Sequence, residues 1–317
     1  MAIVAPKNAH LIRLGKYRGY VPDSWNDLPT AQLLRILAVL LVSGYDPGLR
    51  RADLVTHQRF EILAILLGIE LAELQRHLEV EISAAEEDER EELMWQWNQV
   101  LQLITFPFER LDPDEEEGVA TYRLSLTLTR CPYPQLKMPN GTNWYAPADG
   151  LANISMYEFS HVFTAMDAYT ESKDAADLDK LLAIIYRPAK PPTRENLDSD
   201  FGGDRRQPLY GHDSLVRQRL RYWKRAPQLV KQLLWFWLSS CRQSIVTHPA
   251  LALLFERTES GSPDPFGWTG TMLHLSSDSV VNLPGVATQN YQPALLQLAR
   301  EKLQAQEILE RYRIKGG

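Results

Sequence analysis

Cysteine, long apolar runs and a secretory leader are what this chain of 317 residues has least of. Its two cysteines, Cys131 and Cys241, are too few for a disulfide framework and too far apart for a zinc knuckle. The longest apolar stretch, Ile36–Val42, is far shorter than the ~20 residues that cross a bilayer. The first 14 residues lack the charged and apolar regions of a signal peptide. We therefore expect no membrane segment, reduced thiols, and a place in the cytosol or in a particle assembled there.

Positive charge is not in excess either. The chain has 34 Lys and Arg against 40 Asp and Glu, a net charge of −6, which argues against a general nucleic-acid binder. Its 44% hydrophobic content is enough to form a folded core, so dominant disorder is excluded. The acidic residues gather in runs, above all between Glu79 and Glu92 and between Glu109 and Glu117. Such runs usually mark solvated helix faces and loops.

The common catalytic motifs are absent. The sequence has no phosphate-binding loop, dinucleotide turn, His-Glu-x-x-His or Cys-x-x-Cys pattern, and no nucleophile elbow. The seven histidines are scattered singly, so no pair has metal-ligand spacing. We expect no metal, no cofactor and no enzymatic activity, although catalytic groups can converge from distant positions. A cryptic hydrolase or nuclease would have to use the Asp-x-Asp pairs, which are Asp112 with Asp114, Asp177 with Asp179, and Asp198 with Asp200.

Hydrophobic periodicity predicts a mainly α fold, a helical bundle with a small β-hairpin. In the N-terminal half, apolar residues at three- and four-residue steps predict helices over 29–43, 51–67, 70–78 and 84–104. Alternation from Tyr122 to Thr129 predicts a half-buried strand, with 104–110 as its hairpin partner around an acidic tip. No clean periodicity marks residues 1–27.

Two long irregular segments, 131–150 and 188–211, interrupt this pattern, and whether they are ordered alone stays open. Ser155 and Glu158 read as a capping box that opens a helix, and Asp174 as the cap of the next, which Pro188 stops. Further helices are predicted over 213–225, 227–246, 248–257, 267–278 and 291–313. We place the domain boundary at about 150, between an N-terminal region 1–150 and a C-terminal region 151–317.

Two stretches are candidates for binding. The first is apolar nearly all round and contains Trp235, Phe236 and Trp237, so it belongs in a core or at a partner interface, with burial favoured. The second, 205–225, interleaves basic and aromatic residues that can track a phosphate backbone. Its candidate nucleic-acid contacts are Arg217, Arg221, Trp223, Lys224 and Arg225. A structural helix with a basic outer face is the favoured alternative.

Several short stretches resemble a family of uncharacterised proteins from phage and prophage gene clusters of Bacteroidetes. The matching segments are Trp25-Asn26-Asp27-Leu28, Asn153-Ile154-Ser155, Leu178-Asp179-Lys180-Leu181, Ile184-Ile185-Tyr186-Arg187-Pro188, Leu234-Trp235-Phe236-Trp237 and Phe266-Gly267-Trp268. They span most of the chain, and none is a catalytic signature. The stretch 273–278 departs from the family pattern, where a more apolar helix is expected.

The resemblance implies a non-enzymatic structural or assembly factor of a phage-like tail. Such proteins sit among tail-module genes, in the position that tail assembly chaperones occupy elsewhere. A chaperone of that kind coats the tape-measure chain until tube subunits replace it, which requires apolar surface on a net-negative body. The expected partners are other tail-module proteins, with a second copy of the chain as a further candidate and nucleic acid disfavoured. Partner contacts are assigned to Trp235, Phe236, Trp237, Tyr186 and Arg187, with nucleic-acid binding through 205–225 as the alternative function.

Overall fold

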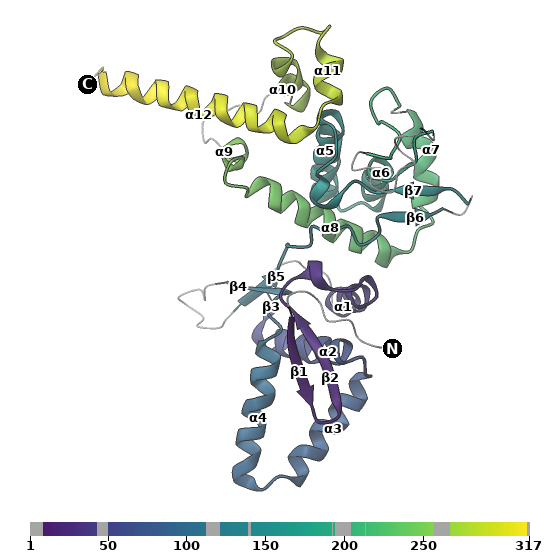
Figure 1. Cartoon of the computed structure of the whole chain (residues 1–317), viewed down its shortest axis with the longest axis vertical. Helices are drawn as coiled ribbons and strands as arrows, with labels where there is room; N and C mark the ends of the chain where they lie inside the picture. The colour runs from purple at the N-terminus through teal and green to yellow at the C-terminus, as the bar shows by residue number, and fades with distance from the viewer. Residues whose placement is uncertain are drawn as a thin grey trace. The chain divides into compact units, whose positions relative to one another are not determined.

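The chain forms two compact units, Met1–Leu128 and Thr129–Gly317, in a computed structural model (Figure 1). The structure describes residues 9–42, 50–111, 121–138, 141–191, 193, 204–212, 214–256 and 267–315. Across these residues it has 12 α-helices and three small antiparallel sheets of two or three strands. The predicted mainly α fold is therefore confirmed.

The first unit combines four helices with two small sheets. Its elements are β1 (Ala9–Leu14), β2 (Tyr17–Pro22), a 3-10 turn (Trp25–Asp27), α1 (Thr30–Val42), β3 (Arg50–Arg51), α2 (Ala52–Leu67), α3 (Leu71–Ala84), α4 (Glu87–Gln102), β4 (Phe108–Leu111) and β5 (Thr121–Leu124). Helix α2 packs against α1, α3, α4 and β2, so it forms the centre of the unit. The predicted pairing of 104–110 with the strand at 122 is confirmed by the β4–β5 ladder, which β3 extends to three strands. The acidic tip lies outside the described residues.

The β1–β2 hairpin occupies a region where sequence periodicity predicted no element. Only Ile12 of β1 is buried, and Leu11 is half exposed, so the strand lacks the alternation that would reveal it. The ladder runs to Leu14 opposite Tyr17, leaving Gly15 and Lys16 as a two-residue turn. Gly15 has a φ of 56°, which only glycine adopts without strain in a turn of this kind.

Trp25 anchors the core of the first unit. The indole is fully buried, stands edge-on to Phe106 at 5.1 Å between ring centroids, and donates from Nε1 to the Ser125 carbonyl at 3.0 Å. Around it lie the apolar residues of α1 that set the predicted helical period, including Leu33, Leu37 and Leu40. The bond from Trp25 ties the 3-10 turn to the chain that follows β5, 100 residues away.

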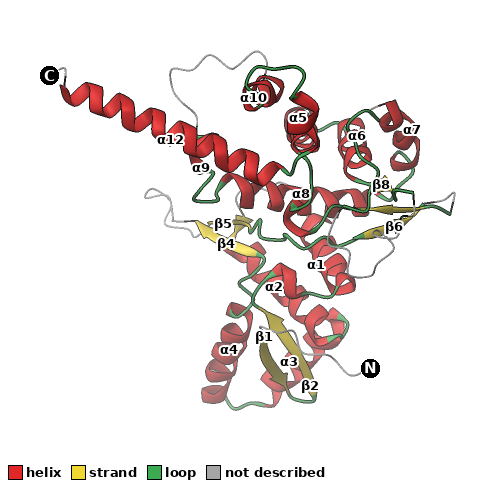
Figure 2. Ribbon diagram, turned by 45° about the horizontal axis from the view of Figure 1, so that its top comes forward, coloured by secondary structure: helices red, strands yellow, loops and turns green. Residues whose placement is uncertain are grey.

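The second unit is built on α5 and α8. Its elements are β6 (Gln135–Lys137), β7 (Asn143–Tyr145), a 3-10 turn (Asp149–Leu151), α5 (Met156–Ser172), α6 (Ala175–Ile185), β8 (Arg187–Pro188), α7 (Ser214–Trp223), α8 (Gln228–Val246), α9 (Ala252–Phe255), α10 (Gly267–Leu275), α11 (Leu283–Thr288) and α12 (Tyr291–Lys315). Helix α6 packs against α5, α7 and α8 (Figure 2). On the opposite side of α5, the Phe159 ring stacks on Tyr291 at 4.8 Å and meets Trp268 edge-on at 4.9 Å.

The segment 131–150 is more regular than predicted. Strands β6 and β7 pair as a hairpin within it, and β8 adds a third strand through Trp144 opposite Pro188. Trp237 of α8 donates from Nε1 to the Thr129 carbonyl at 3.0 Å, which fixes the start of the segment to the second unit. The division between compact units consequently falls after Leu128, earlier than the boundary expected at about 150.

The described part of 188–211 also contains regular pairing. Pro188 pairs with Trp144 of β7, and Ala189 forms an isolated antiparallel bridge with Arg206 within the segment. Residues 192 and 194–203 lie outside the described residues.

Helix α3 extends six residues beyond its predicted end at 78, and α11 was not predicted from the sequence. No helix in the described part of the chain combines the length and apolar character needed to span a bilayer.

Gly19 provides a test of packing in the first unit. A Cβ at this position would lie 2.7 Å from the Leu66 carbonyl oxygen, which belongs to helix α2 and cannot rotate away. We expect Gly19→Ala to lower the free energy of unfolding by about 1–3 kcal/mol, the usual cost of overpacking. Gly285→Ala, on an exposed turn of α11 with open space around the new Cβ, is the matched control and should leave stability equal or slightly higher. Urea denaturation measures both, and equal midpoints for Gly19→Ala and wild type would contradict the contact.

Candidate functional site

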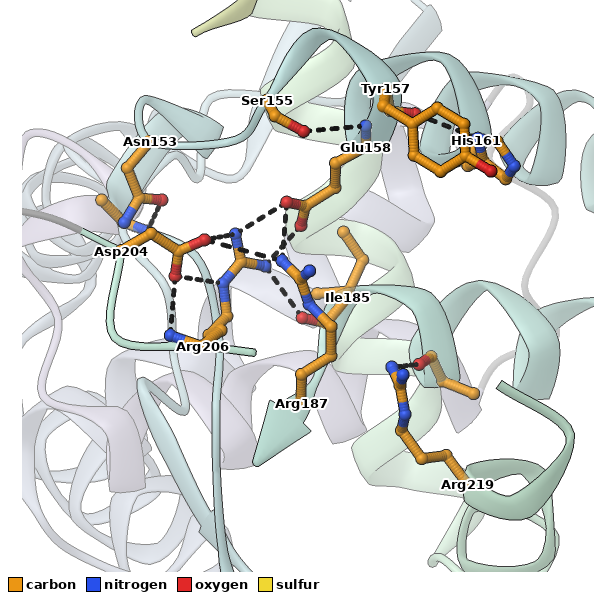
Figure 3. Close-up of polar contacts among 12 residues, drawn as sticks. Asn153, Ser155, Tyr157, Glu158, His161, Ile185, Arg187, Asp204, Arg206 and Arg219 are labelled. Carbon is orange, nitrogen blue, oxygen red and sulfur yellow. Dashed lines mark hydrogen bonds and ion pairs between the residues drawn. The ribbon is translucent and has the colours of Figure 1, made fainter. Parts of the chain in front are cut away.

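Glu158, at the start of α5, has a different role from the one its sequence context predicted. The Ser155 hydroxyl does accept a bond from the Glu158 amide at 3.2 Å, so the cap by Ser155 is confirmed. The Glu158 carboxylate, however, does not turn back to the helix start. It is 2% exposed and binds two arginines that lie 29 and 48 residues further along the chain (Figure 3). The predicted second half of the capping box is therefore wrong.

Four charged side chains form a buried cluster around this carboxylate, which we call the arginine–carboxylate cluster: Glu158, Arg187, Asp204 and Arg206. Arg206 donates from Nη1 to Glu158 at 2.5 Å and to the Ile185 carbonyl at 3.0 Å, and from Nε to Asp204 at 2.8 Å. Arg187 Nη2 lies 2.6 Å from the second Glu158 oxygen. The cluster joins α5, the end of α6, β8 and the segment after the undescribed residues 194–203.

Charge balance explains how this cluster is tolerated in the interior. Desolvation lowers the pKa of Arg187, with the attraction of Glu158 opposing it. For Arg206, desolvation also acts to lower the pKa, but the carboxylates of Glu158 and Asp204 outweigh it and the net pKa is raised. Both guanidiniums stay charged, so two cations face two anions. A hollow of about 460 Å³ borders the cluster, but Glu158 and Arg206 are already paired with each other and offer it no free acid or base.

The five residues predicted to bind partners are mostly core residues. Tyr186, Phe236 and Trp237 have no exposed surface, and Arg187 is 1% exposed. Trp235 is half-buried and meets Tyr169 edge-on at 4.7 Å. Four of the five are therefore buried within their own unit, and their assignment to partner binding stays a prediction. The apolar segment around Phe236 and Trp237 is buried, as the sequence analysis favoured.

The basic–aromatic stretch divides between interior and surface. Arg217, Arg221, Lys224 and Arg225 are exposed, and their spacing of four, three and one residues places them on one side of α7 and the turn after it. Trp223 is 1% exposed and cannot stack on a base. Arg219, which lies on the other side of the helix, is 4% exposed and donates to the Ala183 carbonyl at 2.8 Å. We call the four exposed cations the α7 basic face.

The two cysteines, His161 and the described Asp-x-Asp pair each have a definite place in the structure. Burial raises the pKa of the Cys131 thiol to about 12, and burial also raises that of Cys241. His161 contacts the Tyr157 carbonyl through Nδ1 at 3.0 Å, one helical turn away. The Asp179 carboxylate is buried and lies 2.6 Å from Lys231 Nζ. The Asp177 carboxylate accepts a hydrogen bond from the Ser172 hydroxyl.

No described residues form a group of three His, Cys, Asp or Glu side chains that could hold a metal ion. Of the remaining Asp-x-Asp pairs, Asp112 with Asp114 and Asp198 with Asp200 lie outside the described residues.

Apolar surface remains on α12. Leu303, Ile308 and Leu309 are 51%, 53% and 64% exposed, on the half of the helix that extends beyond the rest of its unit in both views (Figures 1 and 2). Near the middle of α12, a mainly apolar hollow of about 520 Å³ lies between α9, α10 and α12 and is lined by residues including Leu254, Trp268 and Leu298. Leu303, Ile308 and Leu309 lie on different sides of the helix, and together we call them the α12 apolar surface.

Comparison with models of protein families, with curated proteins and with solved structures gives no significant match to this chain. The function must therefore be inferred from the surfaces and the interior of the molecule itself.

The arginine–carboxylate cluster makes a stability prediction. We expect Glu158→Gln to lower the free energy of unfolding by about 3–5 kcal/mol, because it leaves two buried guanidiniums facing one carboxylate. Asp167→Asn is the matched control in the same unit, since Asp167 pairs with Arg242 at 2.6 Å but is half exposed. Removing an exposed pair of this kind costs about 0–1 kcal/mol. Denaturant titration of the two variants compares them directly, and equal losses would show that the cluster is no more stabilising than a surface pair.

Proposed function

We propose that this protein is a non-enzymatic assembly factor that acts by binding other proteins, in a phage-like particle as the sequence resemblance implies. The observation that carries the proposal is the α12 apolar surface. Three large aliphatic side chains are more than half exposed within seven residues of one helix, which leaves apolar area that a partner protein can cover. The buried thiols and the internally paired cluster support a binding role over a catalytic one.

The exposed half of α12 continues a packing stripe that is already used in the first half. Tyr291 and Leu295 are buried against their own unit, Leu298 follows at the next helical step, and Ala305 and Leu309 lie on the same side further along. Lys302 lies between Leu298 and Ala305 on this stripe and donates to the Leu253 carbonyl at 2.7 Å. Beyond Lys302 the stripe passes into solvent. A helix or groove of a partner protein can cover the exposed part in the way that α5 and α9 cover the beginning.

The test is capture of partners from cells in which the gene lies in its natural genomic setting. We expect tagged wild-type protein to recover particle proteins, such as tail-tube or tape-measure subunits, identified by mass spectrometry. The variant Leu303→Gln/Ile308→Gln/Leu309→Gln should recover at least about tenfold less, because a buried apolar anchor at an interface contributes on the order of 1–2 kcal/mol. Its own stability should change little, since all three side chains are exposed.

A matched control changes polar residues on the same half of the helix. Gln304→Ala/Gln306→Ala/Glu310→Ala alters three exposed side chains and leaves the apolar ones in place. It should recover partners as the wild type does. Equal recovery by the apolar variant and the wild type would exclude α12 as the binding surface, and recovery of no particle protein by the wild type would contradict the assembly role.

The α7 basic face favours nucleic-acid binding as a second candidate function. Four exposed cations predict a slope of log affinity against log salt of about −3 to −4 for duplex DNA. Fluorescence anisotropy of a labelled duplex, titrated at several salt concentrations, measures that slope. Arg217→Gln/Arg221→Gln should lower its magnitude by about two, and no binding at about 20 mM salt would remove this function.

A further inference from the structure

The outer side of α4 carries negative charge and exposed apolar side chains together. Asp88, Glu91 and Glu92 are exposed in its first turns, and Trp95, 57% exposed, follows on the same side. The inner side is apolar and faces the unit through Trp97 and Leu101. Asp88 and Glu91 form no ion pair with another described residue. We call these four outer residues the α4 acidic face.

Trp95 distinguishes this face from an ordinary solvated helix surface. All eight tryptophans of the chain lie in the described residues, and Trp95 is the one that is exposed. Trp25, Trp97, Trp144, Trp223 and Trp237 are buried, and Trp235 and Trp268 are half-buried. A large aromatic side chain in water gives up the free energy of burial, and tryptophan is among the residues that contribute most at protein interfaces.

The α7 basic face has the complementary properties. From Ser214 to Ala226 the chain has no Asp or Glu, and the side chains of Arg217, Lys224 and Arg225 form no ion pair with another described residue. The Arg221 guanidinium lies over the Tyr222 ring, 4.9 Å from the ring centroid, and this cation–π contact holds it in place. Leu229, 36% exposed, lies in the first turn of α8, four residues after Arg225 in the sequence.

We propose that the α4 acidic face of one molecule binds the α7 basic face of a second copy of this chain. Unpaired carboxylates then meet unpaired guanidinium and ammonium groups, while Trp95 covers the aliphatic stems of the arginines. Arginine is a preferred partner for an exposed indole. The contact joins two different surfaces, so each bound molecule still presents one free face, and association continues beyond a dimer unless the ring closes.

A contact of this size is small, below the roughly 1,200 Å² of standard interfaces, and is rich in charge. We therefore expect weak self-association that strengthens at low ionic strength, because exposed charges are screened within about 10 Å at 0.1 M salt. Sedimentation velocity of the full chain over a range of concentrations, at about 50 mM and 500 mM salt, measures it. The expected result is concentration-dependent assembly at low salt, and at least about tenfold weaker association at high salt.

Charge reversal on each face identifies the surfaces. Asp88→Lys/Glu91→Lys/Glu92→Lys makes the α4 face basic, and Arg217→Glu/Arg221→Glu/Arg225→Glu makes the α7 face acidic. Glu86 and Glu89 stay unchanged, because their capping box starts α4. Each variant alone then carries two faces of like charge and should be monomeric. An equimolar mixture should assemble, since the acidic faces of one variant meet the basic faces of the other, and a misfolded variant would not give this result.

Trp95→Ala tests the apolar part of the contact without changing charge. It should weaken self-association at least about tenfold, whereas its exposed neighbour Gln96→Ala should not. Wild-type protein that stays monomeric at low salt overturns the proposal, as do reversed variants that assemble as the wild type does. The α12 triple-glutamine variant should self-associate normally. If it alone abolishes assembly, the self-contact belongs to α12 and the α4–α7 contact is excluded.

Discussion

The buried pairing of Glu158 with Arg206 and Arg187 is the constraint from which the arrangement of the second unit follows. It fixes the first turn of α5 to the end of α6, and it fixes the position at which β8 leaves the interior. Strand β8 then pairs with β7, whose Trp144 meets Tyr222 of α7 edge-on at 5.3 Å. The orientation of α7 is set in this way from inside, and its cations are directed to solvent as a consequence. Deleting one partner of a buried ion pair costs more free energy of unfolding than the intact pair contributes, because the other charge is left uncompensated. We therefore infer that the cluster specifies how the elements pack more than it stabilises the fold.

Local sequence patterns predicted the elements that depend on local forces. The apolar spacing of Leu33, Leu37 and Leu40 gave α1, and the caps at Ser155 and Asp174 were confirmed because a side-chain oxygen needs only an amide two or three residues away. The partners of Glu158 could not be predicted, since Arg206 lies 48 residues away and reaches it only when α6 and β8 have folded between them. The β1–β2 hairpin was missed for a different reason. Its one buried residue in β1 leaves no alternation, and the glycine turn was the remaining signal.

The candidate site was harder to predict than the fold, because composition does not say which side of a helix is covered. Trp95 lies in an acidic stretch and Trp223 in a basic one, yet Trp95 is exposed and Trp223 is buried. Trp223 belongs to the side of α7 that packs on α6 and meets Tyr186, whereas Trp95 lies opposite the side of α4 that carries Trp97. A rotation of about 100° per residue separates these outcomes.

Charged groups in the described interior are paired with one another, which supports the proposed binding role. The Arg206 guanidinium binds Glu158, Asp204 and a backbone carbonyl, and the Lys231 ammonium pairs with Asp179. Groups held in this way cannot transfer protons or bind a substrate without first losing their partners, at a cost of several kcal/mol. The surface has the opposite character, with unpaired charges on α4 and α7 and uncovered aliphatic side chains on α12. These uncovered surfaces are where the proposed contacts with other proteins would bury apolar area and pair charges.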